Sequence, residues 1–348
     1  MGRHAPRRID LLSPRDLDED DVRVRPGKGK SRPRSKDRPG HTDAQPGTVI
    51  TVDRGRFTVE LDDLTRIYAI KARELGRKGI VVGDVVDVVG DVSGDNDTQG
   101  RIVRRRERTS TLRRTADDTD PIERVVVANA TQLAVVTATV NPEPRTGLID
   151  RALVAAYDAG IAPMLFVTKT DLRPADELLA MYGPLDLPVH LISGKQLPAG
   201  MRQMLADEST VLVGHSGVGK STLVNNLVPT ADRSTGRVNE VTGRGRHTST
   251  SVEALLLPSG GWIIDTPGIR SFGLAHVDVD RVIEAFPDLH ALTEDCPRGC
   301  THDEEECALN AVTAPDAISR VESLRRLIRS RSTDDDSHER SVHGRAGS

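Results

Sequence analysis

Short β-type runs, separated by Gly and Asp turn residues, fill the chain between Pro46 and about Arg106. Alternating or β-branched apolar residues over a few positions are typical of strands. The expected strands are Thr48–Val52, Phe57–Leu61, Arg66–Lys71, Val85–Val89 and Arg101–Arg105. Their number and length predict a small closed barrel, and the OB-type barrel is the commonest such barrel that binds nucleic acid. The alternative is a barrel that serves only as a spacer.

Apolar β-branched runs alternate with helical stretches from about Ile122 to Leu274. The expected strands are Leu133–Ala138, Met164–Val167, Val189–Ile192, Val211–Val213, Leu255–Leu257 and Trp262–Ile264. The expected helices are Gly147–Asp158, Pro174–Tyr182, Ala199–Ala206 and Gly219–Leu227. Alternation of buried strands with helices predicts a mostly parallel, doubly wound α/β sheet.

The two ends of the chain differ from this central part in composition. The N-terminal residues are rich in Arg, Pro, Gly and Asp and cannot offset the entropy of ordering. Towards the other end, a helical stretch with a Cys-rich interruption precedes a short charged tail. The expected division is a basic flexible tail (1–45), an OB-fold barrel (46–106), an α/β domain (107–275), a small helical domain (276–330) and a disordered tail (331–348).

Charge is distributed unevenly along the 348 residues, although the formal net charge is only −4. Residues 1–40 contain twelve Lys or Arg against seven acidic residues, and Arg101–Arg114 contains seven arginines around Glu107. Such segments neutralise phosphates, or they form a solvated, partly disordered arm. Within the barrel only Phe57 and Tyr68 could stack on bases, so any RNA contact there is expected to be mostly electrostatic.

The chain has no run of eighteen apolar residues, and no apolar stretch follows its basic N-terminus. We therefore expect neither a membrane-spanning helix nor a secretory signal. The three cysteines all lie between Cys296 and Cys307, which argues for metal binding in a reducing compartment rather than for a disulfide framework. These features predict a cytoplasmic protein.

A phosphate-binding loop follows the expected strand Thr210–Val213. The motif G-x-x-x-x-G-K-S/T is matched by Gly214, His215, Ser216, Gly217, Val218, Gly219, Lys220 and Ser221. Its glycines let backbone N–H groups point at phosphates, and the helix that begins near Thr222 adds positive potential. In this context Lys220 is expected to reach the β- and γ-phosphates, and the Ser221 hydroxyl to bind Mg²⁺.

A second phosphate-sensing motif, D-x-x-G, runs from Asp265 to Gly268 at the end of the expected strand Trp262–Ile264. A carboxylate at this place can hold the magnesium shell, and the Gly268 N–H can sense the γ-phosphate. The motif alone would be a common turn. Its position behind a phosphate loop and a hydrophobic strand favours the functional interpretation.

Guanine recognition is indicated by Thr168, Lys169 and Asp171, which follow the expected strand Met164–Val167 and resemble the motif Asn-Lys-x-Asp. The Asp171 carboxylate can accept both N–H groups of a guanine edge, and the Lys169 stem can cover the base. Thr168 replaces the usual Asn, which changes one hydrogen bond that tethers the loop. Ser193 and Gly194 lie where backbone N–H groups could reach guanine O6, although an ordinary loop is an equal alternative.

The order of these motifs distinguishes the chain from ordinary small GTPases, in which the phosphate loop comes first. Here the base-recognition motif precedes the phosphate loop, and Asp265 comes last. Function requires only that the loops meet at the carboxyl edge of one sheet. The sequence therefore predicts a circularly permuted α/β P-loop GTPase domain, in which the segment after Gly268 leads out of the domain.

A Gly-rich stretch at 243–250 is expected to be a mobile switch, in which Thr248 or Thr250 could bind Mg²⁺. Small GTPases commonly carry a Gln directly after D-x-x-G to orient the attacking water. Ile269 occupies that place here and cannot orient water. His247 is our candidate for this role, and the alternative is a histidine that only packs or contacts RNA.

Four possible metal ligands lie within twelve residues, namely Cys296, Cys300, His302 and Cys307. Thiolates and an imidazole at such spacings form a closed tetrahedral site, which is structural because no position stays open. We therefore expect one Zn²⁺ that holds the C-terminal helices together.

Taken together, residues 46–330 resemble the ribosome small-subunit-dependent GTPase family, RsgA. The stretch at 243–250, the motif Asp265–Gly268 and the Cys/Cys/His/Cys group carry the resemblance. It implies an OB barrel, a permuted GTPase domain and a zinc domain. It also implies a monomer that binds a late small-subunit precursor and its rRNA, probes or releases assembly factors, and hydrolyses GTP faster when docked. The family usually has one more residue before its second cysteine and one more before its last.

These features favour a switch in which GTP and Mg²⁺ order the loops and hydrolysis releases them. Two other functions stay open from the sequence. One is a nucleotide-regulated RNA-binding scaffold in which hydrolysis is incidental. The other is a metabolic P-loop ATPase or kinase, which Asp171 would distinguish because its carboxylate favours guanine over adenine.

Overall fold

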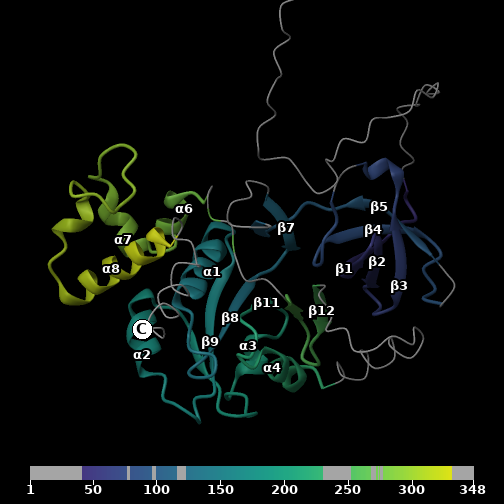
Figure 1. Cartoon of the computed structure of the whole chain (residues 1–348). Coiled ribbons are helices and arrows are strands. Elements are labelled where there is room, and N and C mark those ends of the chain that lie inside the picture. The colour runs from purple at the N-terminus through teal and green to yellow at the C-terminus, as the bar shows by residue number, and fades with distance from the viewer. Residues whose placement is uncertain are drawn as a thin grey trace, which may run out of the picture.

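The protein is described by a computed structural model that covers residues 41–76, 79–95, 99–115, 123–229, 252–267, 272, 274 and 277–330. Figure 1 shows three successive parts: a strand-rich part near the N-terminus, a central sheet with helices, and a helical C-terminal part. Of the predicted flexible tail over 1–45, residues 1–40 lie outside the described residues, and a strand already begins at Gln45; the predicted tail over 331–348 lies wholly outside them. Within the described ranges, no helix has both the length and the apolar character needed to cross a bilayer.

The N-terminal part is a five-stranded closed barrel. Its strands are β1 (Gln45–Asp53), β2 (Arg56–Leu61), β3 (Arg66–Lys71), β4 (Val85–Gly90) and β5 (Gly100–Arg105), with the short 3₁₀ turn Arg73–Leu75 after β3. They pair in the order β1-β2-β3-β5-β4, and β4 pairs back onto β1. Only the β3–β5 pair is parallel. Inward residues such as Val59, Ile67 and Ile102 are fully buried, which confirms the predicted OB-type barrel.

The central part is a six-stranded sheet covered on both faces. Its strands are β8 (Gln132–Ala138), β9 (Ala162–Thr168), β10 (Val189–Leu191), β11 (Ser209–Val213), β12 (Glu253–Leu256) and β13 (Trp262–Asp265). They lie in the order β10-β9-β8-β11-β13-β12, and β12 pairs in turn with β1 of the barrel, Glu253 opposite Thr51. All neighbours are parallel except β12, which runs antiparallel to β13. This arrangement confirms the mostly parallel α/β sheet.

Alternation along β8 shows why both faces are buried. Leu133 and Val135 point into one core with α1 (Thr146–Asp158) and α2 (Asp176–Tyr182). Ala134 and Val136 point into a second core with α3 (Met201–Met204) and α4 (Lys220–Leu227). Because successive side chains of a strand face opposite sides, a continuous apolar run is expected only for a sheet covered twice.

A two-stranded hairpin, β6 (Thr111–Thr115) and β7 (Glu123–Ala128), joins the barrel to the central sheet and was not predicted from the sequence. Its arginines interrupt the apolar pattern, so the sequence indicates a charged connection there instead of two strands. The hairpin forms because the barrel supports it: Val82 pairs with Val127, and the Ala128 N–H donates to Val82 O at 3.0 Å. Tertiary pairing here overrides weak local strand preference.

The junction between barrel and hairpin is held by buried polar contacts. Arg108 donates to both carboxylate oxygens of Asp84, at 2.7 and 2.8 Å, and Asp84 is fully buried. The Asn129 side chain donates to Gly83 O at 2.8 Å. Bidentate ion pairs of this kind fix orientation as well as distance. The barrel is therefore anchored on the hairpin.

The C-terminal part consists of α6 (Val279–Glu284), α7 (Pro287–His290) and α8 (Pro315–Arg329), with 3₁₀ turns at Gly183–Leu185, Ala291–Thr293 and Ala308–Ala311 nearby in the structure. Leu324 and Leu327 of α8 belong to the same apolar core as α1. Arg326 donates to the buried Asp150 of α1 at 3.1 Å and stacks on Tyr182. The C-terminal helices thus pack against α1, which covers one face of the central sheet (Figure 1).

Candidate functional site

The phosphate loop connects the end of β11 to the start of α4, as its motif requires. Gly217 and Gly219 have φ values of +86° and +93°, which only glycine adopts without strain. A Cβ at Gly214 would lie 2.4 Å from the backbone oxygen of Val136, so this position also excludes a side chain. Ser221 and Thr222 are exposed in the first turn of α4, where a ligand can reach them.

Lys220 lies between the phosphate loop and β13. Its Nζ is 2.9 Å from Asp265 Oδ1 and 3.3 Å from Thr266 O. The parallel pairing of Leu212 with Asp265 fixes this distance, and the Thr266 hydroxyl donates back to Leu212 O at 2.7 Å. The motifs that the sequence separates by about 45 residues are therefore adjacent at the carboxyl ends of β11 and β13. Gly268 lies outside the described residues.

Thr168, at the end of β9, ties the base-recognition motif to the phosphate loop. Its Oγ1 lies 2.6 Å from Val218 O and 3.1 Å from Thr137 O, and both contacts are buried. Lys169 has a φ of +59°. Its backbone oxygen accepts a 2.8 Å hydrogen bond from Thr139, and its Nζ contacts Asn141 O. The hydroxyl of Thr168 thus supplies the tether that an Asn provides in the usual motif.

Asp171 joins the two loops expected to recognise the base. Its Oδ1 accepts a 2.8 Å hydrogen bond from the Gly194 N–H, and the Thr170 N–H donates to Ile192 O. The Asn226 side chain of α4 donates to Lys195 O at 2.8 Å, which links this loop to the phosphate-loop helix. The structure therefore brings the Ser193–Gly194 loop beside Asp171, and the contact of its backbone N–H groups with guanine O6 stays a prediction.

His215 and Ser216 lie on the rim of the phosphate loop, where His215 Nδ1 is 3.0 Å from Ser216 O. The candidates His247, Thr248 and Thr250 lie outside the described residues, so their roles stay predictions. Sequence reasoning missed Thr139 and Asn141, which support Lys169 from the end of β8. Their position after a buried strand at the same sheet edge was the signal that could have found them.

The predicted zinc ligands converge in the C-terminal part. The four ligand atoms of Cys296, Cys300, His302 and Cys307 all lie within 4.8 Å of one another. Cys296 Sγ is 3.7 Å from His302 Nδ1 and 3.9 Å from Cys307 Sγ. Bonds of about 2.3 Å to a tetrahedral ion imply ligand separations of roughly 3.8 Å, so the geometry fits Zn²⁺.

Local backbone conformation explains why the unusual cysteine spacing still closes the site. Gly299 and His302 have φ values of +76° and +66°, which turn the chain twice between Cys296 and Cys307. Burial lowers the pKa of His302, which favours the neutral imidazole that binds metal. Burial raises the pKa of the Cys300 thiol to about 12, so zinc binding would release a proton there.

A buried arginine holds the backbone between the phosphate site and the C-terminal helices. Arg151 of α1 is 5% exposed and donates to Phe272 O at 2.8 Å. Phe272 is fully buried in the core shared by the sheet and the C-terminal helices. The backbone is therefore held at Thr266, beside Lys220, and again at Phe272, only six residues later.

Comparison with known proteins agrees with this geometry. A family model described as RsgA GTPase matches residues 105–275. The "Small ribosomal subunit biogenesis GTPase RsgA" of Ectopseudomonas mendocina is 41% identical over 253 residues, which cover 69% of this chain and 73% of that protein.

Two solved structures share the fold. YjeQ from Thermotoga maritima matches with a TM-score of 0.61 and 24% identity, over 84% of this chain and 99% of that one. YloQ, described as a circularly permuted GTPase, matches with a TM-score of 0.58 and 25% identity, over 86% of this chain and 100% of that one.

Proposed function

Because the chain belongs to the RsgA GTPase family, we propose that it hydrolyses GTP to GDP and phosphate in the biogenesis of the small ribosomal subunit. One observation carries the proposal. The loops that contain Asp171, Lys220 and Asp265 lie together at one edge of the sheet, although their order along the chain is permuted. Such a site places a guanine base at one end and its phosphates at the other.

The phosphates would lie against the loop Gly214–Ser221, whose backbone N–H groups and the Lys220 ammonium face them. Ser221 and Asp265 would hold Mg²⁺, which neutralises charge on the phosphates when it is bound. The Lys220–Asp265 ion pair supports this assignment because it already places a cation and a metal-binding carboxylate beside the loop. Thr222 and the rim residues His215 and Ser216 complete the phosphate side.

The guanine base would lie between the Lys169 stem and the loop that carries Ser193 and Gly194. The Asp171 carboxylate would accept the two N–H groups of guanine, a pair that adenine lacks. Support comes from the position of Asp171, which is fixed by the Gly194 N–H. Thr168 supports the base loop through its contact with Val218 O.

Hydrolysis needs a positioned water, and we assign this role to His247, with Thr248 or Thr250 as a further Mg²⁺ ligand. Gly268 would sense the γ-phosphate. These assignments rest on the motif at 243–250 and on Ile269, which replaces the usual water-orienting Gln. In this mechanism the docked subunit completes the positioning of water or charge and so accelerates turnover.

The remaining parts of the proposal concern partners and organisation. We propose that the barrel (46–106) and the zinc domain (276–330) grip subunit rRNA on either side of the GTPase domain (107–275), with one structural Zn²⁺ on the Cys/Cys/His/Cys group. The relatives' name supports the small subunit as the partner. Assembly factors as further partners, a monomeric state and a cytoplasmic location belong to the same proposal.

The deciding experiment measures GTP turnover with and without purified small ribosomal subunits over a range of salt. We expect subunits to raise turnover by at least tenfold, and Lys220→Ala to abolish both basal and stimulated turnover. ATP should compete poorly with GTP for the unaltered protein. If small subunits leave GTP turnover unchanged at every salt concentration, the proposed partner is wrong. If ATP competes as well as GTP, the guanine assignment is wrong.

A further inference from the structure

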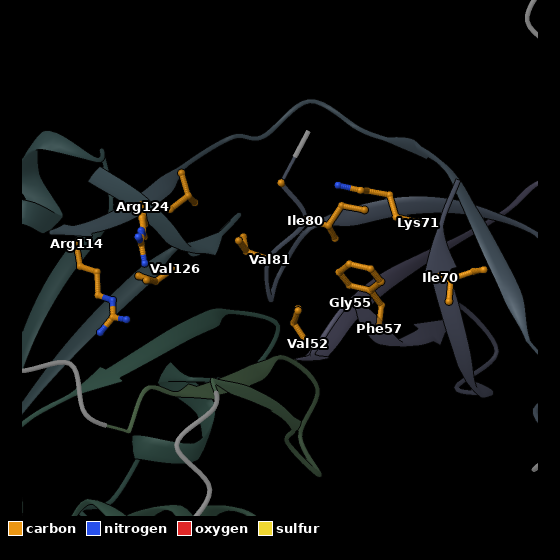
Figure 2. Close-up of a pocket in the computed structure, with 12 residues that line it drawn as sticks. Val52, Gly55, Phe57, Ile70, Lys71, Ile80, Val81, Arg114, Arg124 and Val126 are labelled. Atoms are coloured by element: carbon orange, nitrogen blue, oxygen red, sulfur yellow. The ribbon is translucent and has the colours of Figure 1, made fainter. Parts of the chain in front are cut away.

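A cavity of about 540 Å³ lies between the barrel and the hairpin (Figure 2). Its lining includes Phe57, Ile70, Lys71, Ile80, Arg114 and Arg124. A volume of this size is typical of sites for small organic ligands. None of the described residues that we assign to GTP binding lines this cavity.

The two walls of the cavity differ in chemistry. The barrel wall is largely apolar, with Phe57 and Ile80 buried to 5% and 6% exposure and Ile70 beside them. The hairpin wall carries Arg114 and Arg124, which Figure 2 shows side by side. Lys71 adds a third cation from the barrel, and none of the lining residues that the structure describes is acidic. The cavity thus pairs an apolar surface with concentrated positive charge.

Arg114 and Arg124 are direct cross-strand partners in the hairpin ladder. Like charges placed directly opposite each other on one sheet face are destabilising. Other arginines near the barrel pair with carboxylates, as Arg108 does with Asp84. By contrast, the buried Nε of Arg114 has no hydrogen-bond partner in the described part of the chain. An arginine pair arranged in this way is suited to an anion that bridges it.

We propose that this cavity binds one unstacked nucleotide of single-stranded RNA, with a phosphate between Arg114 and Arg124 and the base against Phe57 and Ile80. The inference rests on the proposed function, since that function makes rRNA the partner. Single-stranded RNA is commonly recognised by cations along its backbone and by apolar or aromatic surfaces under its bases.

A polymer fits better than a free nucleotide because positive charge continues beyond the cavity. Ile70 and Lys71 of β3 pair with Arg101 and Ile102 of the adjacent strand β5. Arg101 is exposed, so it can contact the next phosphate of a strand whose nucleotide occupies the cavity. A free mononucleotide would leave that charge unused.

The test measures binding of a fluorescein-labelled, mixed-sequence RNA octanucleotide to the full-length protein by anisotropy across a salt series. Arg114→Gln should weaken binding about five- to tenfold and reduce the slope of log K against log salt by about 0.7, the value for one single-strand phosphate. The matched control Arg104→Gln removes the same charge from the barrel outside the cavity and should change binding by less than about twofold. Equal losses in both variants would show general electrostatic attraction and overturn the proposal.

A charge reversal separates binding from folding. Arg114→Glu replaces a repulsive cross-strand pair by an attractive one, so the thermal midpoint should stay level or rise while RNA affinity falls at least tenfold. A fall in the thermal midpoint with affinity retained would mean that Arg114 is structural, and would overturn the proposal.

Crosslinking locates the base. An octanucleotide with one 4-thiouridine should crosslink to peptides that contain Phe57 or Ile80, and uridine monophosphate at millimolar concentration should not displace it. Crosslinks elsewhere, or full displacement by the mononucleotide, would overturn the inference. Stimulation of the unaltered protein by small subunits tests the proposed function separately: retained stimulation without RNA at the cavity would contradict only this site.

Discussion

At the scale of single residues, the nucleotide site depends on a few side chains that hold loops rather than contact the substrate. Thr168 is one of them, because its hydroxyl lies 2.6 Å from the buried Val218 O of the phosphate loop. Thr168→Val keeps the shape and removes this hydrogen bond, at a cost of about 1–2 kcal/mol. We expect GTP affinity, measured with a fluorescent analogue, to fall roughly five- to thirtyfold.

The matched control is Thr168→Asn, which restores the usual residue and can donate the same hydrogen bond. It should retain affinity within about twofold. If the valine variant binds GTP as tightly as the unaltered protein, the contact does not support the loop.

Asp171 is the residue that should define the base. In Asp171→Asn, an amide donor replaces one acceptor oxygen, so GTP affinity should fall by about a hundredfold or more, equivalent to roughly 3 kcal/mol. Xanthosine triphosphate has a carbonyl where guanine has an amine, so the variant should bind it better than GTP. Competition titrations would measure both ligands.

A variant that loses affinity for both ligands in equal measure would indicate damage to the Gly194 contact rather than altered recognition. Arg173→Gln provides a nearby control, since Arg173 forms a surface ion pair with the exposed Glu143. That change should leave the preference for guanine intact.

The residues that could be predicted are those whose chemistry is tied to a motif. The zinc ligands and the phosphate loop were identified from type and spacing alone, and the structure brings each set together. Thr139 and Arg151 could not be predicted in this way. Their importance comes from backbone oxygens that only the folded chain places beside them.

At the scale of elements, apolar runs defined the barrel strands and the central sheet because both bury those runs. The hairpin β6–β7 escaped prediction because its stability comes from the barrel and not from its own sequence. Gly83 shows how close this contact is: its φ is +87°, and an added Cβ would lie 2.1 Å from Ala128 O.

Gly83→Ala should therefore destabilise the protein by roughly 3 kcal/mol or more, through both backbone strain and collision with the hairpin. Gly55→Ala is the matched control, with a φ of +83° and no neighbour within 4 Å of the added Cβ. It should cost only about 1 kcal/mol. Thermal and denaturant unfolding would compare the two, and equal costs would mean that the junction tolerates the extra atom.

The segment that carries the zinc ligands contains only short turns between α7 and α8. Its order should therefore depend on metal, whereas α8 is held by the shared core and by Arg326 on Asp150. Removal of Zn²⁺ by a chelator, or Cys296→Ala, should speed amide exchange over 291–311 at least tenfold and leave α8 protected.

Glu304→Gln is the control for this experiment, because the Glu304 carboxylate accepts hydrogen bonds from Thr301 and from the Cys300 thiol without belonging to the four ligands. It should retain one zinc per chain by elemental analysis. Exchange that is unchanged after complete zinc removal would show that the segment is stable without metal.

At the scale of the whole molecule, the permuted order has a mechanical consequence. Asp265 ends β13, the last strand that the structure describes, and the next described helix along the chain is α6 of the C-terminal part. Arg151 holds this passage at Phe272, within the core shared by both parts. A change at the γ-phosphate is therefore only a few residues from the zinc domain, and the barrel joins the central sheet both through the hairpin and through the pairing of β1 with β12, next to β13.

This arrangement predicts that Arg151 carries the response to the subunit rather than the chemistry. Arg151→Met fills a similar volume but leaves Phe272 O without this donor, so the segment after Asp265 is no longer fixed to α1. We expect basal GTP turnover within about twofold of the unaltered protein and subunit-stimulated turnover reduced about tenfold. The control Arg281→Met removes an exposed arginine that also bonds α1, through Asp158 O at 3.2 Å, and should change neither rate. If basal and stimulated turnover fall together in Arg151→Met, the arginine supports the nucleotide site itself, and coupling to the C-terminal helices must follow another route.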